Sequence, residues 1–423
     1  MDKIYKKILS ISLIFVFSMT SFSQALETPI RSYSNSEVVS EFLGELDSKI
    51  SNYERQRISA LVRSWKNLYE SRISAKKAEP SIREAQAMKE LTKKLDEYTV
   101  KYYFDGKYEV NQNYGDYHNY VIQNIKHVIA LSDYNRLYIL CEKYERDYSI
   151  TDEQVQKIVD EISMILRKYP RLNPEQLLSH ILDGSENLLA VYSINESRLE
   201  YDEIPYVTLE EKDVRIKKDF PDVWREILSI IPYEYFHGFD EFMLTSDGEM
   251  NNLGYVRNND STGSRWSISI DPEDISDKDL FYETIIHEYF HYVTLNETQV
   301  SYLDVPNVYT YYDHEVVTNI DSYLNAFSMR FWDLLKYESK FTQDSYLFYM
   351  RHDPDFVSRY ASTDPAEDIC ESFTAFVLSE KPVDNSEIGR KISFFYEYPE
   401  FVELRQIIRS NIINLAEAEE KAA

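Results

Sequence analysis

His287, Glu288 and His291 form the pattern HExxH in the second half of the 423-residue chain. Residues four positions apart in a helix project from the same face, so these two imidazoles could reach one metal ion. A zinc ion takes imidazole nitrogens at about 2.0–2.1 Å, and successive helical turns offer two of them on one side. Glu288 would not be a ligand in such a site. It would act as the general base toward a zinc-activated water.

The residues around this motif favour a helix that is seated in a hydrophobic core. Ile286, Phe290 and Val293 recur at positions i, i+4 and i+7 and form an apolar stripe. Asp277 or Ser276 can cap the start of the helix. Because HExxH also arises by chance, the prediction of a metal site depends on a third ligand elsewhere in the chain.

Several residues compete for the place of the third ligand. The metzincin pattern HExxHxxGxxH is excluded, because Thr294 and Glu297 stand where it has Gly and His. Glu297 is close in sequence but lies past the expected end of the helix. Glu315 falls near the spacing that thermolysin-like enzymes use, but no helical acidic pattern surrounds it. Both residues remain alternatives.

Glu367 is the favoured third ligand. Asp364 can cap a helix and Pro365 is tolerated in its first turn, so a helix is expected to begin here. The buried side of this helix would carry Ile369, Phe373 and Phe376. Glu367 and Glu371 share another face, where two stacked carboxylates beside apolar residues need a cation or hydrogen-bond donors. We therefore predict that Glu367 binds the metal and that Glu371 accepts a hydrogen bond from a ligating histidine. The alternative is a capping box of Asp364 and Glu367, with Glu371 solvated.

Three segments together resemble a known family. HEYFH at 287–291, Tyr360 and EDICESF at 367–373 are similar to the catalytic domain of the anthrax lethal-factor family and the related Pro-Pro endopeptidases, which are glutamate-type zinc metallopeptidases. That family has HExxH, a tyrosine seven residues before the third ligand, and ExxxE followed by an aromatic residue. Asp368 and Cys370 depart from the aromatic and small residues usual there. The resemblance covers only the C-terminal part of the chain.

The resemblance implies a role for each matching residue. One zinc ion per chain would be held by His287, His291 and Glu367, with Glu371 supporting the ligands. Glu288 would be the general base, and Tyr360 would donate a hydrogen bond to the oxyanion of the transition state. His352 lies close to Tyr360 in sequence and could assist it, although a place at the protein surface is the favoured expectation.

The first 25 residues are typical of a secretory signal. Three lysines precede an apolar run at 8–19, and a small-x-small pattern ends at Ala25. The run is short for a membrane span, and no later stretch is long and apolar enough to be one. We therefore expect a secreted chain, extracellular or periplasmic, without stable membrane insertion.

The composition limits the partners. The chain has 46 basic and 73 acidic residues, a formal charge of −27, so its surface repels nucleic acid and anionic lipid. The charge either provides only solubility or attracts basic segments of a substrate. Cys141 and Cys370 are too few for a disulfide scaffold, and the sequence leaves open whether they pair. Oligomeric state is also left open.

The expected fold class is α+β with helix predominating. After the signal, residues 26–182 form a helical region, with a connector at 105–116 that could divide it into two subdomains. Residues 183–423 form a zincin-like domain in which a small sheet precedes the HExxH helix. Its expected elements are strands at 206–209 and 242–245, a helix at 223–231, and a hairpin of 253–256 with 265–270. An edge strand beside the site could bind an extended peptide through main-chain hydrogen bonds.

The sequence thus predicts a secreted zinc-dependent endopeptidase of the HExxH-plus-glutamate type, acting on a protein or peptide substrate. Two alternatives stay open. The first is a secreted binding or toxin-like module in which the metal is structural or absent. The second is a zinc hydrolase of non-peptide amides or esters, because the ligands alone do not define the substrate.

Overall fold

Helices dominate the computed structural model, and the strands it describes form one five-stranded sheet and one two-stranded ribbon. The predicted fold class, α+β with helix predominating, is confirmed. The signal predicted at 1–25, the strand predicted at 206–209 and the alternative ligand Glu315 lie outside the described residues. The structure describes residues 50–77, 80–108, 118–147, 151–182, 187–202, 204, 211–246, 253–302, 305–313, 316–332 and 335–422.

The described residues fall into two units. The first unit draws on Met1–Asn111, Asp260–Ser264 and Tyr289–Ala423. The second draws on Gln112–Asn259 and Arg265–Glu288. The predicted connector at 105–116 contains the change from one unit to the other, whereas the predicted division after residue 182 falls inside the second unit. That division stays a prediction.

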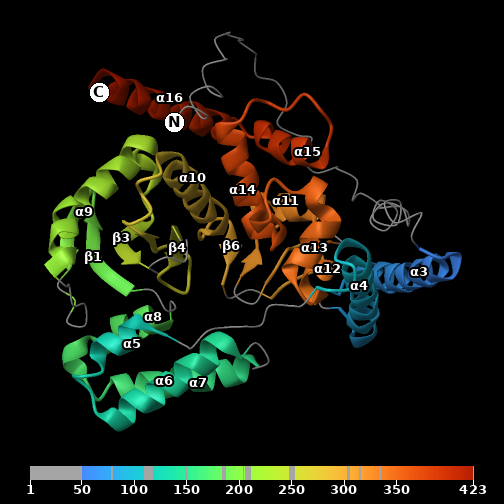
Figure 1. The fold of residues 1–423 in the computed structure, drawn as a ribbon, viewed down its shortest axis with the longest axis horizontal. Coiled ribbons are helices and arrows are strands. Elements are labelled where there is room, and N and C mark those ends of the chain that lie inside the picture. The colour runs from blue at the N-terminus through green and yellow to red at the C-terminus, as the bar shows by residue number, and fades with distance from the viewer. Residues whose placement is uncertain are drawn as a thin grey trace. The chain divides into compact units, whose positions relative to one another are not determined.

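The second unit is built on a mixed sheet with strand order β2-β1-β3-β5-β4 (Figure 1). β3 and β5 are parallel, and the other neighbouring pairs are antiparallel. The predicted hairpin is confirmed as β4 and β5, with Val256 opposite Ile268, and β4 is an edge strand. The strands are β1 (Asn187–Asn195), β2 (Arg198–Asp202), β3 (Phe239–Ser246), β4 (Gly254–Asn258) and β5 (Trp266–Ile270).

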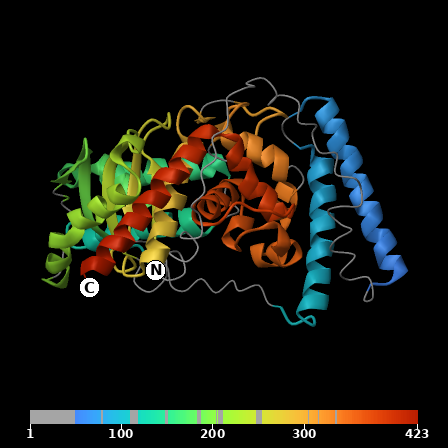
Figure 2. The ribbon, with the colours of Figure 1, turned by 90° about the horizontal axis from the view of Figure 1, so that it is seen from above.

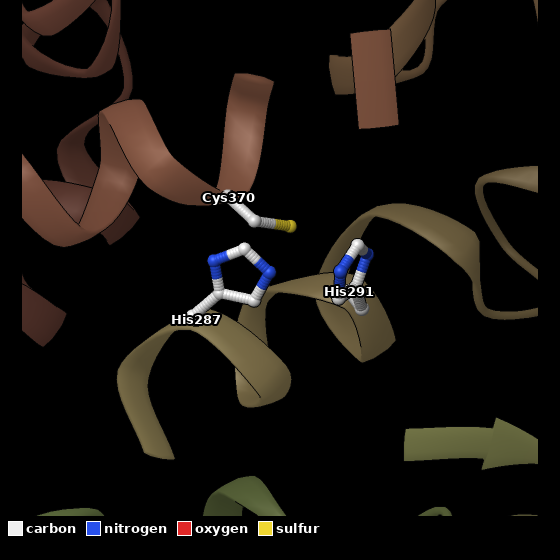
Figure 3. A group of neighbouring side chains, drawn as sticks. All are labelled: His287, His291 and Cys370. Atoms are coloured by element: carbon white, nitrogen blue, oxygen red, sulfur yellow. The ribbon is translucent and has the colours of Figure 1, made fainter. Parts of the chain in front are cut away.

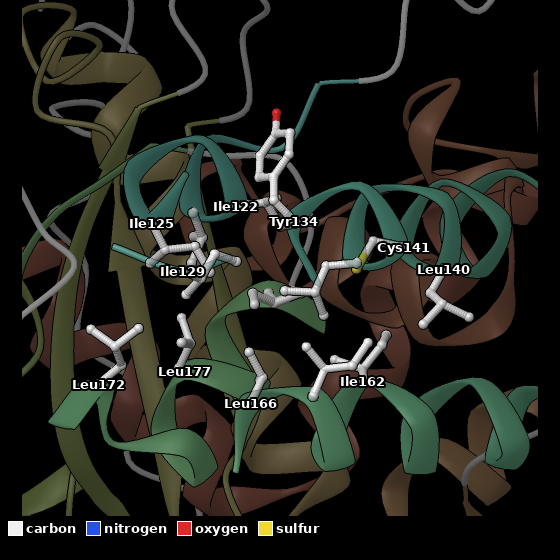
Figure 4. Packing of buried hydrophobic residues seen from close by; sticks show 14 of the residues in the cluster. Ile122, Ile125, Ile129, Tyr134, Leu140, Cys141, Ile162, Leu166, Leu172 and Leu177 are labelled. Atoms are coloured by element: carbon white, nitrogen blue, oxygen red, sulfur yellow. The ribbon is translucent and has the colours of Figure 1, made fainter. Parts of the chain in front are cut away.

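Helices cover both faces of this sheet. Adjacent residues of a strand point to opposite faces, so neighbouring residues of β3 contact different helices. Met243 on β3 and Val191 on β1 join a buried cluster with residues of four helices and the short helix η1. Figure 4 labels residues that these helices contribute, among them Ile122, Leu140 and Leu177. The neighbouring Phe242 contacts Trp224 of α9, with ring centroids 5.4 Å apart. The helices of this unit are α5 (Tyr120–Ile125), α6 (Leu131–Arg146), α7 (Asp152–Leu166), η1 (Pro170–Leu172), α8 (Pro174–Leu182), α9 (Glu211–Ile230), η2 (Tyr233–Tyr235) and the first part of α10 (Lys278–Leu295).

The described part of the first unit begins with two long helices, α3 and α4, that lie side by side as a hairpin (Figures 1 and 2). Every described element before residue 183 is helical, as the apolar spacing predicts. The unit contains α3 (Asn52–Ser74), α4 (Ile82–Tyr103), the rest of α10, β6 (Val300–Ser301), β7 (Val317–Thr318), α11 (Tyr323–Phe331), α12 (Leu335–Phe341), α13 (Ser345–His352), η3 (Asp353–Asp355), η4 (Tyr360–Ser362), α14 (Pro365–Leu378), α15 (Glu387–Phe394), η5 (Phe395–Glu397) and α16 (Pro399–Ala422).

A buried charge network fixes α4 against α12 and α13 inside this unit. Arg351 on α13 donates from Nη1 to Asp96 Oδ1 and from Nε to Glu338 Oε1, both at 2.8 Å. Asp96 also accepts from the Thr342 hydroxyl at 2.8 Å and from the backbone N–H of Gln343 at 2.9 Å. The two carboxylates and the guanidinium are therefore almost fully paired where water is excluded.

His352 belongs to the same network, so the expectation that it lies at the surface is wrong. Its residue is only 6% exposed. Nε2 donates to Glu338 Oε2 at 3.2 Å, and Nδ1 forms an ion pair with Asp355 Oδ2 at 3.6 Å. Sequence position alone missed this, because the carboxylate that holds it lies fourteen residues earlier, on α12.

The stability of the protein is expected to fall as the pH rises above neutrality because of His352. Burial alone would lower the pKa of His352, but the charge of Glu338 and hydrogen bonds to Asp355 and Glu338 outweigh burial and the nearby Arg351 and raise it to about 9. Between about pH 6.5 and 9 the folded chain therefore holds a proton that the unfolded chain has lost. The stabilisation is complete below this window and lost through it.

The measurement is the free energy of urea unfolding at several pH values for the wild type and His352→Gln. The difference between the two should shrink by about 3 kcal/mol across the window, at about 1.4 kcal/mol per pKa unit. A difference that stays constant with pH would show that His352 is neutral in the folded chain.

The structure also bears on the two cysteines and on membrane insertion. Cys141 and Cys370 are both buried thiols and do not form a disulfide. Within the part of the chain that the structure describes, no helix combines the length and apolarity needed to cross a bilayer. Oligomeric state stays open.

Candidate metal centre

The HExxH motif lies on α10, as predicted. Asp277 caps this helix, since its Oδ1 accepts from the backbone N–H groups of Asp279 and Leu280 at 3.2 and 3.3 Å. The helix runs without interruption through His287 and His291, so helical spacing sets both imidazoles on one face. His287 is only 5% exposed. The motif's histidines are therefore side by side and largely removed from water.

Helix α14, the predicted carrier of the third ligand, also begins as the sequence predicts. Asp364 Oδ1 accepts from the backbone N–H groups of Ala366 and Glu367 at 2.7 and 3.1 Å, and Pro365 occupies the first turn. Ile369, Phe373 and Phe376 are fully buried, as expected. The capping prediction and the buried face of this helix are both confirmed.

An aromatic stack fixes α14 against the last turns of α10 within the first unit. The rings of Phe290 and Phe373 are parallel within 9°, with centroids 3.7 Å apart. Phe395 and Phe401 contact both rings edge-on. Because Phe290 precedes His291, this stack holds the turn of α10 that carries His291 against α14.

His291 and Glu367 meet directly. The distance from His291 Nε2 to Glu367 Oε2 is 3.3 Å, and both side chains are mostly buried, 12% and 18% exposed. A capping role alone would not bring the Glu367 carboxylate to an imidazole of another helix. Of the alternative ligands, Glu297 lies beyond the end of α10, where its backbone N–H donates to Gly263 O at 3.0 Å.

Cys370 is a neighbour of the histidines that sequence reasoning did not predict as a ligand. The ligand atoms of His287, His291 and Cys370 all lie within 4.8 Å of one another, and the thiol of α14 points toward the two rings (Figure 3). Its signal in the sequence is only its place one helical turn after Glu367. Imidazole, carboxylate and thiolate are the donors that zinc takes, so the side chains present fit that ion.

A second carboxyl group, that of Asp364, lies beside the proposed ligands Glu367 and His291. Burial and the charge of Glu367 raise the pKa of Asp364 to about 6, against backbone hydrogen bonds and His291, which lower it. A cation bound at Glu367 would favour the charged form of Asp364 again, because a nearby positive charge lowers the pKa of a carboxyl group. This electrostatic arrangement is a second reason why the residues fit a divalent metal.

Glu288, the predicted general base, is held by the edge strand of the second unit. Its Oε2 accepts a hydrogen bond from the backbone N–H of Val256 on β4 at 3.0 Å. Just outside β4, the carbonyl oxygen of Leu253 accepts from the N–H of Asp271, and the N–H of Asn259 donates to the carbonyl oxygen of Arg265. Both residues therefore direct these main-chain groups to the side of β5. Alternate residues of an antiparallel strand face opposite edges, so Gly254, Val256 and Asn258 direct their main-chain groups away from β5.

Gly254 leaves no room for a side chain against the neighbouring strand β5. A Cβ atom there would lie 2.6 Å from Ser269 O, 2.9 Å from Ile270 Cδ1 and 3.5 Å from Thr284 Cγ2 on α10. Gly254→Ala is therefore expected to destabilise the protein by about 1–3 kcal/mol through overpacking. Thermal unfolding measures this loss, and an unchanged melting temperature would show that β4 moves outward at no cost.

Ser358 links Glu371 to the short helix η4, which begins at Tyr360. Tyr360 begins η4 and is 54% exposed. Ser358 Oγ donates to Glu371 Oε2 at 2.5 Å and accepts from the backbone N–H of Ala361 at 3.0 Å, which ties the Tyr360 turn to α14. Ser358 was missed because a lone serine carries no distinctive signal. The bond predicted from a ligating histidine to Glu371 stays a prediction.

Comparison with known proteins adds no assignment. No family model, no curated protein and no solved structure matches the chain. The resemblance to the lethal-factor family therefore rests on the short motifs alone.

Proposed function

We propose that the protein is a secreted zinc-dependent endopeptidase of the HExxH-plus-glutamate type. The observation that carries the proposal is the 3.3 Å approach of Glu367 Oε2 to His291 Nε2. The two residues are 76 positions apart, and chance occurrence of HExxH would not require a distant acidic residue to meet its second histidine. His287, His291 and Glu367 are the proposed ligands.

The chemistry divides between the metal and the side chains. When bound, zinc supplies Lewis acidity that polarises a carbonyl oxygen and makes water more acidic. Glu288 takes the proton of the attacking water and later passes a proton to the leaving amine. Tyr360 donates a hydrogen bond to the oxyanion of the transition state, and Glu371 supports the ligands.

The edge strand β4 suits an extended peptide as substrate. The position of β4 at the edge of the sheet supports this, because an extended peptide can add as a further strand at a sheet edge. The hydrogen bond from Val256 to Glu288 places the proposed base at this same edge. A substrate paired with β4 would therefore pass the proposed base.

The proposal is tested with purified mature protein. Metal content should be one zinc ion per chain, and profiling of a peptide library by mass spectrometry should reveal internal cleavage. A chelator should abolish cleavage and added zinc should restore it. Absence of zinc would leave a metal-free binding module, and zinc uptake with no cleavage of any peptide would overturn the peptidase while leaving a structural metal or a non-peptide hydrolase.

A further inference from the structure

A fully buried ion pair lies directly behind the proposed third ligand. Lys391 on α15 and Asp368 on α14 are each 0% exposed, with Nζ and Oδ2 2.6 Å apart. Asp368 follows Glu367 in the sequence. Its carboxylate also accepts from Trp332 Nε1 at 2.6 Å and from Ser372 Oγ at 3.2 Å. The orientation of α14 is thus fixed by charge and hydrogen bonds at the turn that bears Glu367.

The same ammonium group reaches a second part of the proposed site. Lys391 Nζ donates to the backbone carbonyl of Asp355 in η3 at 2.7 Å and lies 3.8 Å from the ring centroid of Phe356. From there the chain continues to Ser358, which bonds Glu371, and to Tyr360. One side chain therefore joins the helix of Glu367 to the segment that carries Tyr360.

The energetics argue that this pair serves geometry more than stability. Removing two charges from water is costly, and well-packed apolar residues of similar volume often stabilise a core as well or better. A lysine has three donor directions, and here a carboxylate, a carbonyl oxygen and an aromatic face lie around its nitrogen. Such a saturated contact restricts two elements to one arrangement.

We infer that Lys391, with Asp368, is a positioning residue of the proposed metal site. It sets α14 so that Glu367 meets His291, and it holds the segment from Asp355 to Tyr360 at a fixed distance from that helix. The inference rests on the proposed function, because the ligand role of Glu367 belongs to that proposal. It goes beyond it by assigning a residue that touches neither metal nor substrate.

The test compares two charge-neutral double variants of the full mature chain. In Asp368→Asn/Lys391→Met, Asn retains an acceptor for Trp332 while the tie to Asp355 is lost. The matched control is Glu84→Gln/Arg72→Met, which removes another buried pair, 2.9 Å apart, in the α3–α4 hairpin. Arg72 likewise donates to a backbone carbonyl, that of Lys77, and it also bonds Glu84 and the Tyr337 hydroxyl of α12. The double variant avoids the unpaired buried carboxylate that Lys391→Met alone would leave at Asp368, which can prevent folding.

The readouts are zinc affinity by chelator competition and the visible absorption spectrum of the cobalt-loaded protein, which reports ligand geometry. The Asp368→Asn/Lys391→Met variant should bind zinc about 10–100-fold more weakly, as for the loss of residues that orient metal ligands. Its cobalt spectrum should change and kcat should fall more than KM rises. The control should leave affinity and spectrum unchanged.

Each outcome is decisive for one of the two proposals. A folded Asp368→Asn/Lys391→Met variant with wild-type zinc affinity and spectrum overturns the positioning role and leaves the proposed function intact. An equal loss in the control also overturns it, because general destabilisation would then explain the result. A wild type that binds zinc but cleaves no peptide overturns the peptidase alone, and a wild type that binds no zinc overturns both.

Discussion

Glu288→Gln is expected to lower peptide cleavage on the order of 10³-fold while leaving zinc bound. The amide is the same size as the carboxylate, and its oxygen can still accept the hydrogen bond from the Val256 N–H that now anchors Glu288. An amide cannot take a proton from water at neutral pH, so the general-base step is lost. Because Glu288 is not a proposed ligand, the metal should remain.

The measurements are kcat on a cleaved library peptide and the zinc content of the same sample. Glu283→Gln is the matched control, since Glu283 is exposed on the same helix five residues earlier. It removes one negative charge from α10 and should leave both quantities near those of the wild type. Undiminished turnover in Glu288→Gln would exclude Glu288 as the base, and loss of zinc would make it a ligand instead.

The parts of the site that the sequence predicts are those with local signals. HExxH spacing, the Asp277 cap and the apolar stripe together predict α10, and Asp364-Pro365 predicts the start of α14. These signals depend on neighbours within a few residues, where helical geometry is fixed. The pairing of Glu367 with His291 has no such local signal: it follows from the need of two stacked carboxylates for a compensating cation and from the resemblance to the lethal-factor family.

The parts that sequence reasoning missed depend on contacts between distant segments. Ser358 bonds Glu371 across thirteen residues, and His352 is buried because Glu338 and Asp355 surround it. The types of these residues are typical of surfaces, so composition and periodicity assign them there. Only tertiary packing shows that a lysine such as Lys391 is fully buried.

The helical hairpin at the start of the described chain provides the largest expected effect on stability. Arg351→Met should lower the free energy of unfolding by about 3–5 kcal/mol, because it leaves buried carboxylates without their cation. The guanidinium now bonds Asp96 at 2.8 Å, Glu338 at 2.8 Å and the Thr99 hydroxyl at 3.0 Å. Asp96 and Thr99 both belong to α4, so the hairpin should loosen first.

Urea unfolding monitored by tryptophan fluorescence measures the loss, since Trp65 lies in the hairpin core and contacts Tyr337 of α12. Arg136→Met is the matched control: the same substitution removes a two-bond pair with Glu161 that is exposed to solvent, so its effect should be far smaller. Adding Asp96→Asn to Arg351→Met should recover part of the loss by removing one uncompensated charge. Equal losses for Arg351→Met and Arg136→Met would show that the buried network does not hold α4 in place.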